Sequence, residues 1–323
     1  MKTGINIANV RMVAATALIT VLTAATAVGQ QSPDARVEQA TFTQPGSGKT
    51  TQRVTFARQV VHVGDEVDQN LALDLRMTMT MRKANEMVGK NQTTVRTNQK
   101  RILTTTEVEN GRTVAIRVRY PVSTKEESIV EELEPKQPTV TPQPVQGKTY
   151  LCRRESGENG QLIVTDEAGN QPPTDEYEIV AQQMQMVGRS NPLAQFLAGR
   201  TIAVGEKIEL PNAVASQIFN LGDKYGKVSR FTLTLQKVQV ERSTTCAVFQ
   251  ANVEAVANAA TQMRLEVEGP LVVDVATCRA QKISLVGPIG MSETRGSYST
   301  AYQVIGTGKL QMSIASIYRD AKR

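Results

Sequence analysis

The stretch Leu71–Met81 alternates strictly between large apolar residues and small, polar or charged ones. Side chains of a β-strand point to opposite faces in turn, so this pattern predicts one strand with a buried face and a solvated face. A helix would scatter the same apolar residues around its axis. The predicted buried face consists of Leu71, Leu73, Leu75, Met77, Met79 and Met81.

Other segments repeat this alternation and predict a mainly β fold, with long antiparallel meander sheets forming a half-barrel or a sandwich. The pattern indicates two strand-rich halves, at residues 51–120 and within 149–323, around a short helical middle. Asn110-Gly111 predicts a tight hairpin, because both residues tolerate positive φ. Further turns or loops are expected at residues 89–92, 158–160, 205–206, 269–270, 287–288 and 290–299.

The middle of the chain changes character. Residues 121–148 hold five prolines and an acidic run, which favours an acidic, Pro-rich linker with a short helical turn near residue 128. Residues 174–198 are expected to be helical. Thr174 or Asp175 is predicted to cap the N-terminus of the first helix, and Gly188 is predicted to end it. A second short helix is predicted to begin at Asn191-Pro192.

The N-terminus has the features of an export signal. Basic residues precede an uncharged apolar stretch, and Ala25-Thr26-Ala27 gives the small-x-small pattern that a signal peptidase recognises. We therefore expect residues 1–27 to be a signal peptide and residues 28–50 a flexible lead-in, with an uncleaved N-terminal anchor as the alternative. The expected location is periplasmic or secreted, as part of a bacterial cell envelope, with no transmembrane segment after cleavage.

Three cysteines, Cys152, Cys246 and Cys278, permit three alternative disulfides and leave one thiol over. The pairing of Cys246 with Cys278 is favoured, because both are expected in consecutive strands of one meander. The spacings match no zinc-binding pattern.

The residues that could carry chemistry indicate a protein that is not an enzyme. The single histidine, His62, lies in an expected strand, and the chain has no G-x-S-x-G motif. Adjacent carboxylates such as Asp65 and Glu66 would point to opposite faces of a strand. A glycosidase site would also need aromatic side chains against which sugar rings stack, and the chain has no tryptophan. No catalytic residue, resident metal or cofactor is predicted.

The run Met77-Thr-Met-Thr-Met81 has two interpretations. Three thioethers on one strand face could bind Cu(I), which prefers soft sulfur ligands. Methionine is also a pliable filler of cores and cavities, and here the methionines continue the Leu71–Leu75 face. The favoured interpretation is a core or the lining of an apolar ligand site.

The chain is basic, with a formal net charge of +6. Its cationic residues around the first strands could meet anionic lipid or polymer, although a solvated outer sheet face is favoured. Nucleic-acid binding is not expected, since aromatic residues do not interleave with the basic ones. The residues assigned to this outer face are Arg76, Arg82, Lys83, Arg96, Lys100, Arg101, Arg117 and Arg119.

Three patterns resemble uncharacterised families of exported bacterial β-rich proteins: Val63-Gly64 before the Leu/Met strand, Leu197-Ala-Gly199 through Gly205-Glu206, and the closing strand Thr307–Tyr318. The chain also looks somewhat like the half-open β-barrels of periplasmic lipoprotein carriers. That resemblance implies a concave sheet that holds acyl chains, and it transfers no functional residue.

Three functions follow as hypotheses. The first is an exported, non-enzymatic protein that binds an apolar or lipid-like ligand on the concave Leu/Met face, or packs that face against the helix at 174–188. The second is a structural or protein-interaction protein of the envelope with no small ligand. The third is a periplasmic protein that handles Cu(I) through Met77, Met79 and Met81.

Overall fold

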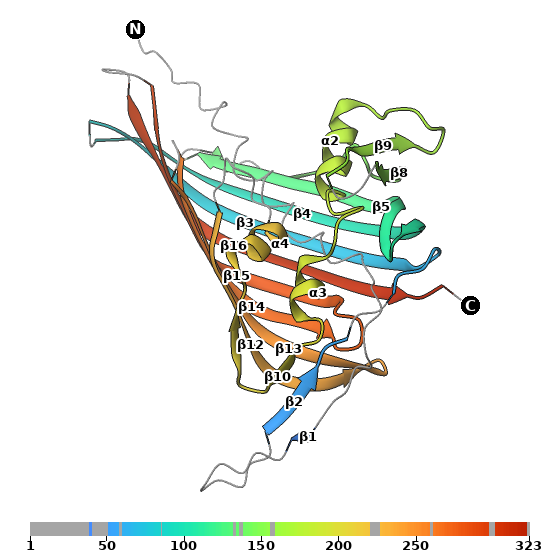
Figure 1. The fold of residues 1–323 in the computed structure, drawn as a ribbon. Helices are drawn as coiled ribbons and strands as arrows, with labels where there is room; N and C mark the ends of the chain where they lie inside the picture. Colours follow the sequence, from blue (N-terminus) through green and yellow to red (C-terminus); the bar gives the residue numbers. More distant parts are fainter. Residues whose placement is uncertain are drawn as a thin grey trace, which may run out of the picture.

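The computed structural model describes residues 39–40, 51–57, 60–84, 86–131, 134–135, 138–155, 159–219, 227–258, 261–296 and 301–321. The predicted signal peptide and most of the lead-in lie outside these residues. The fold is mainly β, as predicted, and its dominant element is one open antiparallel sheet (Figure 1). In the described part of the chain, no helix is long and apolar enough to cross a membrane.

The large sheet has thirteen strands, and its main path runs β11-β12-β13-β14-β15-β16-β3-β4-β5-β8-β9. The short strands β6 (Glu134–Pro135) and β7 (Thr139–Pro142) pair with β5. The main strands are β3 (Glu66–Lys83), β4 (Glu86–Glu109), β5 (Arg112–Glu131), β8 (Thr149–Arg154), β9 (Leu162–Asp166), β11 (Lys207–Glu209), β12 (Lys227–Glu241), β13 (Thr244–Asn258), β14 (Thr261–Asp274), β15 (Ala280–Arg295) and β16 (Tyr302–Arg319).

The two strand-rich halves belong to one sheet. The closing strand β16 pairs along its length with β3, from Gln303 opposite Arg82 to Arg319 opposite Glu66. This pairing places the last strand of the chain next to the first long one. The result is a curved sheet that wraps around short helices on its inner face (Figure 1).

Turn chemistry explains some strand ends. Asn110 and Gly111 both have positive φ, 49° and 72°, and Glu109 pairs with Arg112, so the predicted two-residue hairpin is confirmed. The turn predicted at residues 89–92 is wrong, because these residues lie inside β4. The chain turns earlier, where Ala84 has a φ of 49°.

Several predicted interruptions are absent from the sheet. Residues 121–131 continue β5 instead of starting a linker or a helical turn, and β7 pairs back onto this part of β5. β14 continues through Gly269-Pro270, and β15 continues through Gly287-Pro288 into most of the predicted polar loop. The strand register is the same on both sides of these two dipeptides, so the sheet accepts them without a bulge, a possibility that sequence punctuation does not reveal.

The helical middle is shorter than predicted. Helix α2 covers Thr174–Gln183, and its N-cap is Pro173, with no side-chain capping bond, rather than Thr174 or Asp175. Helix α3 covers Pro192–Leu197, which confirms the predicted start at Asn191-Pro192. The Asn191 side chain caps the helix by accepting a hydrogen bond from the Ala194 N–H at 3.1 Å. A further helix, α4 (Asn212–Ile218), was not predicted.

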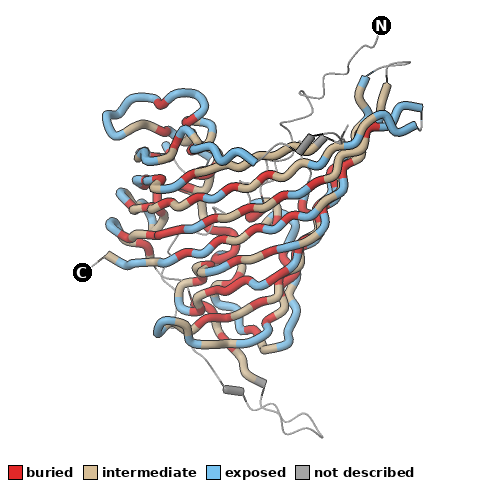
Figure 2. Tube along the Cα trace, turned by 180° about the vertical axis from the view of Figure 1, so that it is seen from behind, coloured by how far each residue is buried: buried red, intermediate tan, exposed pale blue. Residues whose placement is uncertain are grey.

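Helices α3 and α4 and the small strands close the inner face. Strand β2 (Thr51–Thr55) lies between β1 (Gln39–Ala40) and β10 (Thr201–Ala203), separate from the large sheet. The principal core joins α3, α4, β2 and β10 to the inner side chains of β3 and β12–β16. A second, smaller core lies between α2 and strands β4, β5 and β8. Buried and exposed residues alternate along the strands (Figure 2).

The favoured disulfide is wrong, because all three cysteines are buried free thiols. Cys246 neighbours Ala247, which faces the principal core, so Cys246 points to the opposite side of the sheet. Cys278 lies in a turn with a φ of 54°, joins the principal core and donates its S–H to the Ala57 carbonyl at 2.9 Å. The two sulfurs therefore face different sides.

Replacing Gly308 with alanine is expected to destabilise the fold. A Cβ atom there would lie 2.1 Å from the backbone carbonyl oxygen of Arg76, so β16 and β3 would have to separate locally. We expect Gly308→Ala to lower the free energy of unfolding by about 1–3 kcal/mol in urea titrations, as overpacking does. Gly290→Ala is the control, since its nearest neighbour would be 3.9 Å away. Equal stability of the two variants would contradict this close strand approach.

Candidate functional site

The predicted Leu/Met face is real and lies on the inner side of β3. Leu71, Leu73, Leu75 and Met77 are buried in the principal core, together with residues of α3 and α4. The helix that covers this face is therefore not α2, as one version of the first hypothesis proposed. Met79 is only partly buried and packs at the margin of the same core.

Three methionines converge near this margin. Gly306 of β16 lies between Met79 and Met291 in the strand registers. A Cβ atom added to Gly306 would lie 2.8 Å from the Met79 Sδ, 2.8 Å from the Met77 Cε and 2.7 Å from the Met291 Cγ. Because glycine has no side chain, position 306 leaves a space, and three flexible thioether side chains fill it. Met81 instead reaches toward Gly89 of β4.

A row of polar side chains runs beside the apolar face on β4. Thr97 pairs with Leu73, Gln99 with Leu71, and Arg101 with Gln69, so these side chains share the inner face. All three β4 residues are almost fully buried, with Arg101 only 1% exposed. The assignment of Arg101 to the solvated outer face is wrong. Lys100 does point outward and pairs with Asp68 at 3.1 Å.

The guanidinium of Arg101 is held by two neutral amides. Its Nε donates to Gln69 Oε1 at 2.7 Å, and its Nη1 donates to Gln183 Oε1 of α2 at 3.4 Å. Gln69 is itself oriented, because its Nε2 donates to the Ser316 hydroxyl at 3.1 Å. Burial lowers the pKa of Arg101 to about 10, so the group remains charged at neutral pH.

Helix α2 is anchored over this region by a second polar cluster. Glu176 accepts hydrogen bonds from Lys148 Nζ at 2.5 Å and from the Tyr150 hydroxyl at 2.6 Å. Burial acts to raise the pKa of Glu176, but the bonds from Lys148 and Tyr150 hold it below its ordinary value. The ionised carboxylate therefore ties α2 to β8 and to the segment that precedes it.

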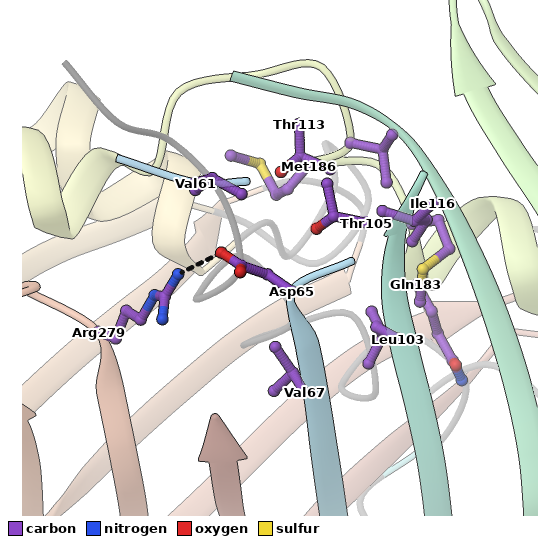
Figure 3. A pocket seen from close by; sticks show the side chains of 12 residues that line it. Val61, Asp65, Val67, Leu103, Thr105, Thr113, Ile116, Gln183, Met186 and Arg279 are labelled. Atoms are coloured by element: carbon purple, nitrogen blue, oxygen red, sulfur yellow. Dashed lines mark hydrogen bonds and ion pairs between the residues drawn. The ribbon is translucent and has the colours of Figure 1, made fainter. Parts of the chain in front are cut away.

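Beyond Arg101, a small cavity of about 30 Å³ lies where α2 meets the ends of β3, β4 and β5 (Figure 3). Its walls are mostly apolar, and Gln183 connects it to Arg101. A cavity of this size holds water molecules rather than an organic ligand. The lining residues are Val61, Asp65, Val67, Leu103, Thr105, Thr113, Ile116, Gln183, Met184, Met186, Val187 and Arg279.

Asp65 in this wall joins distant parts of the chain. Its carboxylate accepts the His62 N–H at 3.0 Å, the Ala321 N–H at 3.0 Å and Arg279 Nη2 at 3.4 Å. Arg279 in turn pairs with Asp320 at 3.1 Å and lies over the Tyr318 ring. This carboxylate fastens the start of β3 to the C-terminal end of β16, a structural role. His62 lies in the adjoining turn rather than in a strand.

A wider hollow of about 280 Å³ lies between β13, β14 and β15, near Gly287-Pro288. Glu254 and Glu266 line it, and both are ion-paired, with Arg230 and Arg264 respectively. Throughout the described residues, no group of three or more His, Cys, Asp or Glu side chains is placed to hold a metal ion. A third carboxylate, Glu268, also lines the hollow, and the lining includes no cationic residue.

No protein-family model matches the chain, and no curated protein matches it. Among solved structures, lipovitellin, described for its lipid–protein interactions, is 8% identical with a TM-score of 0.37 and aligns with 80% of this chain. The chain spans only 26% of lipovitellin.

A LolA superfamily protein from Nitrosomonas europaea is 8% identical, with a TM-score of 0.12, over 78% of this chain and 87% of that one. An acetoacetate decarboxylase-like enzyme from Sphingomonas wittichii is 8% identical, with a TM-score of 0.11, over 82% and 96%. These weak resemblances are too distant to transfer a function, so the site must be judged on its own residues.

Removing the Asp65 carboxylate is expected to destabilise the protein. Asp65→Asn loses the charge that faces Arg279 and keeps only one acceptor oxygen for three donors. We therefore expect it to lower the free energy of unfolding in urea by about 2 kcal/mol. Asp320→Asn is the matched control, because its exposed side chain contributes less than about 1 kcal/mol. An effect of Asp65→Asn no larger than that of the control would contradict the fastening role.

Proposed function

We propose that this protein is an exported, non-enzymatic envelope protein that binds an apolar or lipid-like ligand at the inner face of its large sheet. The observation that carries the proposal is the margin of the principal core. There Met79 and Met291 are only partly buried, beside the missing side chain of Gly306. An apolar wall that continues out of a filled core is suited to an additional apolar molecule.

The composition of this wall supports a ligand with a flexible chain. Thioether side chains are unbranched and polarizable, so they adapt to ligands of variable shape at little cost. Aliphatic and thioether groups provide neither a nucleophile nor a general base, which favours carriage over catalysis. Export rests on the sequence of residues 1–27. Met79 would contact the ligand. The buried residues behind it would support the site from within the core, and these are Leu71, Leu73, Leu75 and Met77.

The test is native mass spectrometry of the protein purified from an exporting host without detergent. We expect additional mass that dissociates as lipid. Gly306→Val occupies the space that the three methionine side chains fill and pushes them into the margin proposed for the ligand, so the bound mass should fall to background while the thermal transition is retained. Gly290→Val, on the other face of neighbouring β15, should leave the bound mass unchanged.

Bare protein mass, with no uptake of added lipids, would overturn the proposal. It would favour the structural or protein-interaction alternative, in which the inner face serves only as a core. Loss of bound lipid from both glycine variants would show a general effect on the sheet rather than a filled site.

The convergence at Gly306 also favours a revised form of the copper hypothesis, in which Met291 replaces Met81 beside Met77 and Met79. If this cluster binds Cu(I), anaerobic titration with Cu(I) should give one bound ion. Met77→Leu, Met79→Leu and Met291→Leu combined should abolish binding, and Met81→Leu should not. Unchanged uptake by the triple variant would exclude this role.

A further inference from the structure

The charge on Arg101 has no carboxylate partner among the ion pairs of the described residues. Two cations on the outer face of the same strand do have one: Arg96 pairs with Asp74 and Glu126, and Lys100 pairs with Asp68. Burying a charge without an opposite one is costly, so such a group is rarely retained only for packing.

A second buried arginine shows how the fold satisfies a guanidinium when the role is structural. Arg154 donates to the backbone carbonyls of Val187 at 2.5 Å, Gly160 at 2.6 Å and Gln185 at 2.5 Å. All three of its nitrogens are used. Arg101 uses its Nε and Nη1, whereas its Nη2 is buried and has no hydrogen-bond partner.

Further polar atoms with unfilled hydrogen-bonding capacity lie on the same inner face. Thr97 Oγ1, Gln99 Oε1 and the Tyr120 hydroxyl are also buried without a partner. Thr97, Gln99 and Arg101 occupy alternate positions of β4, and Tyr120 lies on the adjacent strand β5. In the β4–β5 ladder Lys100 is opposite Val122 and Ile102 is opposite Arg119, so Arg101 and Tyr120 both lie at the register shift between these pairs. Together they offer a cationic donor, two hydroxyls and one amide acceptor.

We propose that Arg101 binds the anionic head group, a carboxylate or a phosphate, of an amphiphile whose apolar chain lies along the Leu/Met face. This inference rests on the proposed function and specifies its ligand class. Planar guanidinium donors suit these oxyanions, and the free Nη2 supplies the unused donor. The Tyr120 hydroxyl adds a further donor, whereas Thr97 lies four residues along β4 from Arg101, about 13 Å at the rise of a strand, and faces the path of the chain instead.

The strand registers place head and chain side by side. Arg101 is directly opposite Gln69, and Leu71 is the next inner residue along β3. From Leu71 the apolar face continues through Leu73, Leu75 and Met77 to the open margin at Met79, about 27 Å away at the rise of a strand. A charged head at Arg101 therefore has an apolar path beginning at the neighbouring residue. Because Leu71, Leu73, Leu75 and Met77 are buried in one core with residues of α3 and α4, binding along this path requires the displacement of that segment.

The experiment compares four twelve-carbon probes with different head groups, each titrated calorimetrically as the monomer, below its micelle concentration or, for dodecanol, below its solubility limit. The probes are dodecanoate, dodecyl phosphate, dodecanol and dodecyltrimethylammonium, with inorganic phosphate as the head group alone. We expect the two anions to bind at least about tenfold more tightly than dodecanol, because one hydrogen bond to a charged group strengthens binding by about that factor. Arg101→Met should abolish this preference and leave dodecanol binding unchanged.

Arg119→Met is the matched control, because it removes the same charge from an exposed position on β5. It should keep the preference for anions. Arg101→Met removes an uncompensated buried charge, so its thermal transition should be no lower than that of the parent. If it fails to fold, Arg101→Lys provides the test: it keeps the charge but loses the planar fork, and should reduce the anion preference.

Each remaining outcome separates this inference from the proposed function. Equal binding of dodecanol and the anions by the parent protein would overturn the Arg101 subsite and keep the apolar site. Binding of inorganic phosphate as tightly as dodecyl phosphate, lost in Arg101→Met, would keep an anion site and overturn the amphiphile. Binding of none of the probes would overturn both.

Discussion

The pairing of β3 with β16 is the contact on which the rest of the structure depends. It joins the first long strand to the last one over seventeen register positions, from Glu66 opposite Arg319 to Arg82 opposite Gln303. Such a contact is highly non-local, so it forms only after the chain closes a very large loop. Without it, the N-terminal and C-terminal meanders would each have an exposed edge strand. With it, the inner side chains of β3 join those of β12–β16 in the principal core.

The glycines and the ion pairs around this contact explain how the two strands come so close. Gly308 lets the backbones of β16 and β3 approach at Arg76, and Gly306 gives space to the methionines of the inner face. At the other end, Asp65 holds Ala321 and Arg279, so the start of β3 is fixed to the region beyond β16. Close packing in the middle and polar fastening at one end therefore maintain the register of the junction.

Much of the fold could be predicted from local pattern, because strand alternation and the Asn110-Gly111 turn are short-range signals. The Leu71–Met81 face is such a case. The partner of β3 could not be predicted, since pairing depends on residues more than two hundred positions away. The same limit explains the wrong disulfide: sequence placed Cys246 and Cys278 in neighbouring elements but could not tell which face each would occupy. Helix α4 was missed because it is short and lacks a side-chain cap.

Arg101 illustrates why the candidate site was harder to predict than the fold. Lys100 and Arg101 are adjacent, so in a regular strand one of them must face inward. Charge alone favours placing both outside, and only the pairing of β4 with β3 identifies which one is buried. The inward residue is opposite Gln69, at the boundary between the two apolar cores, where Val67 belongs to one core and Leu71 to the other. Gln69 and Gln99 make this boundary polar, and Arg101 adds a buried positive charge to it. Selection for stability alone would favour an apolar residue there, which is why a bound anion offers the better physical account of this position.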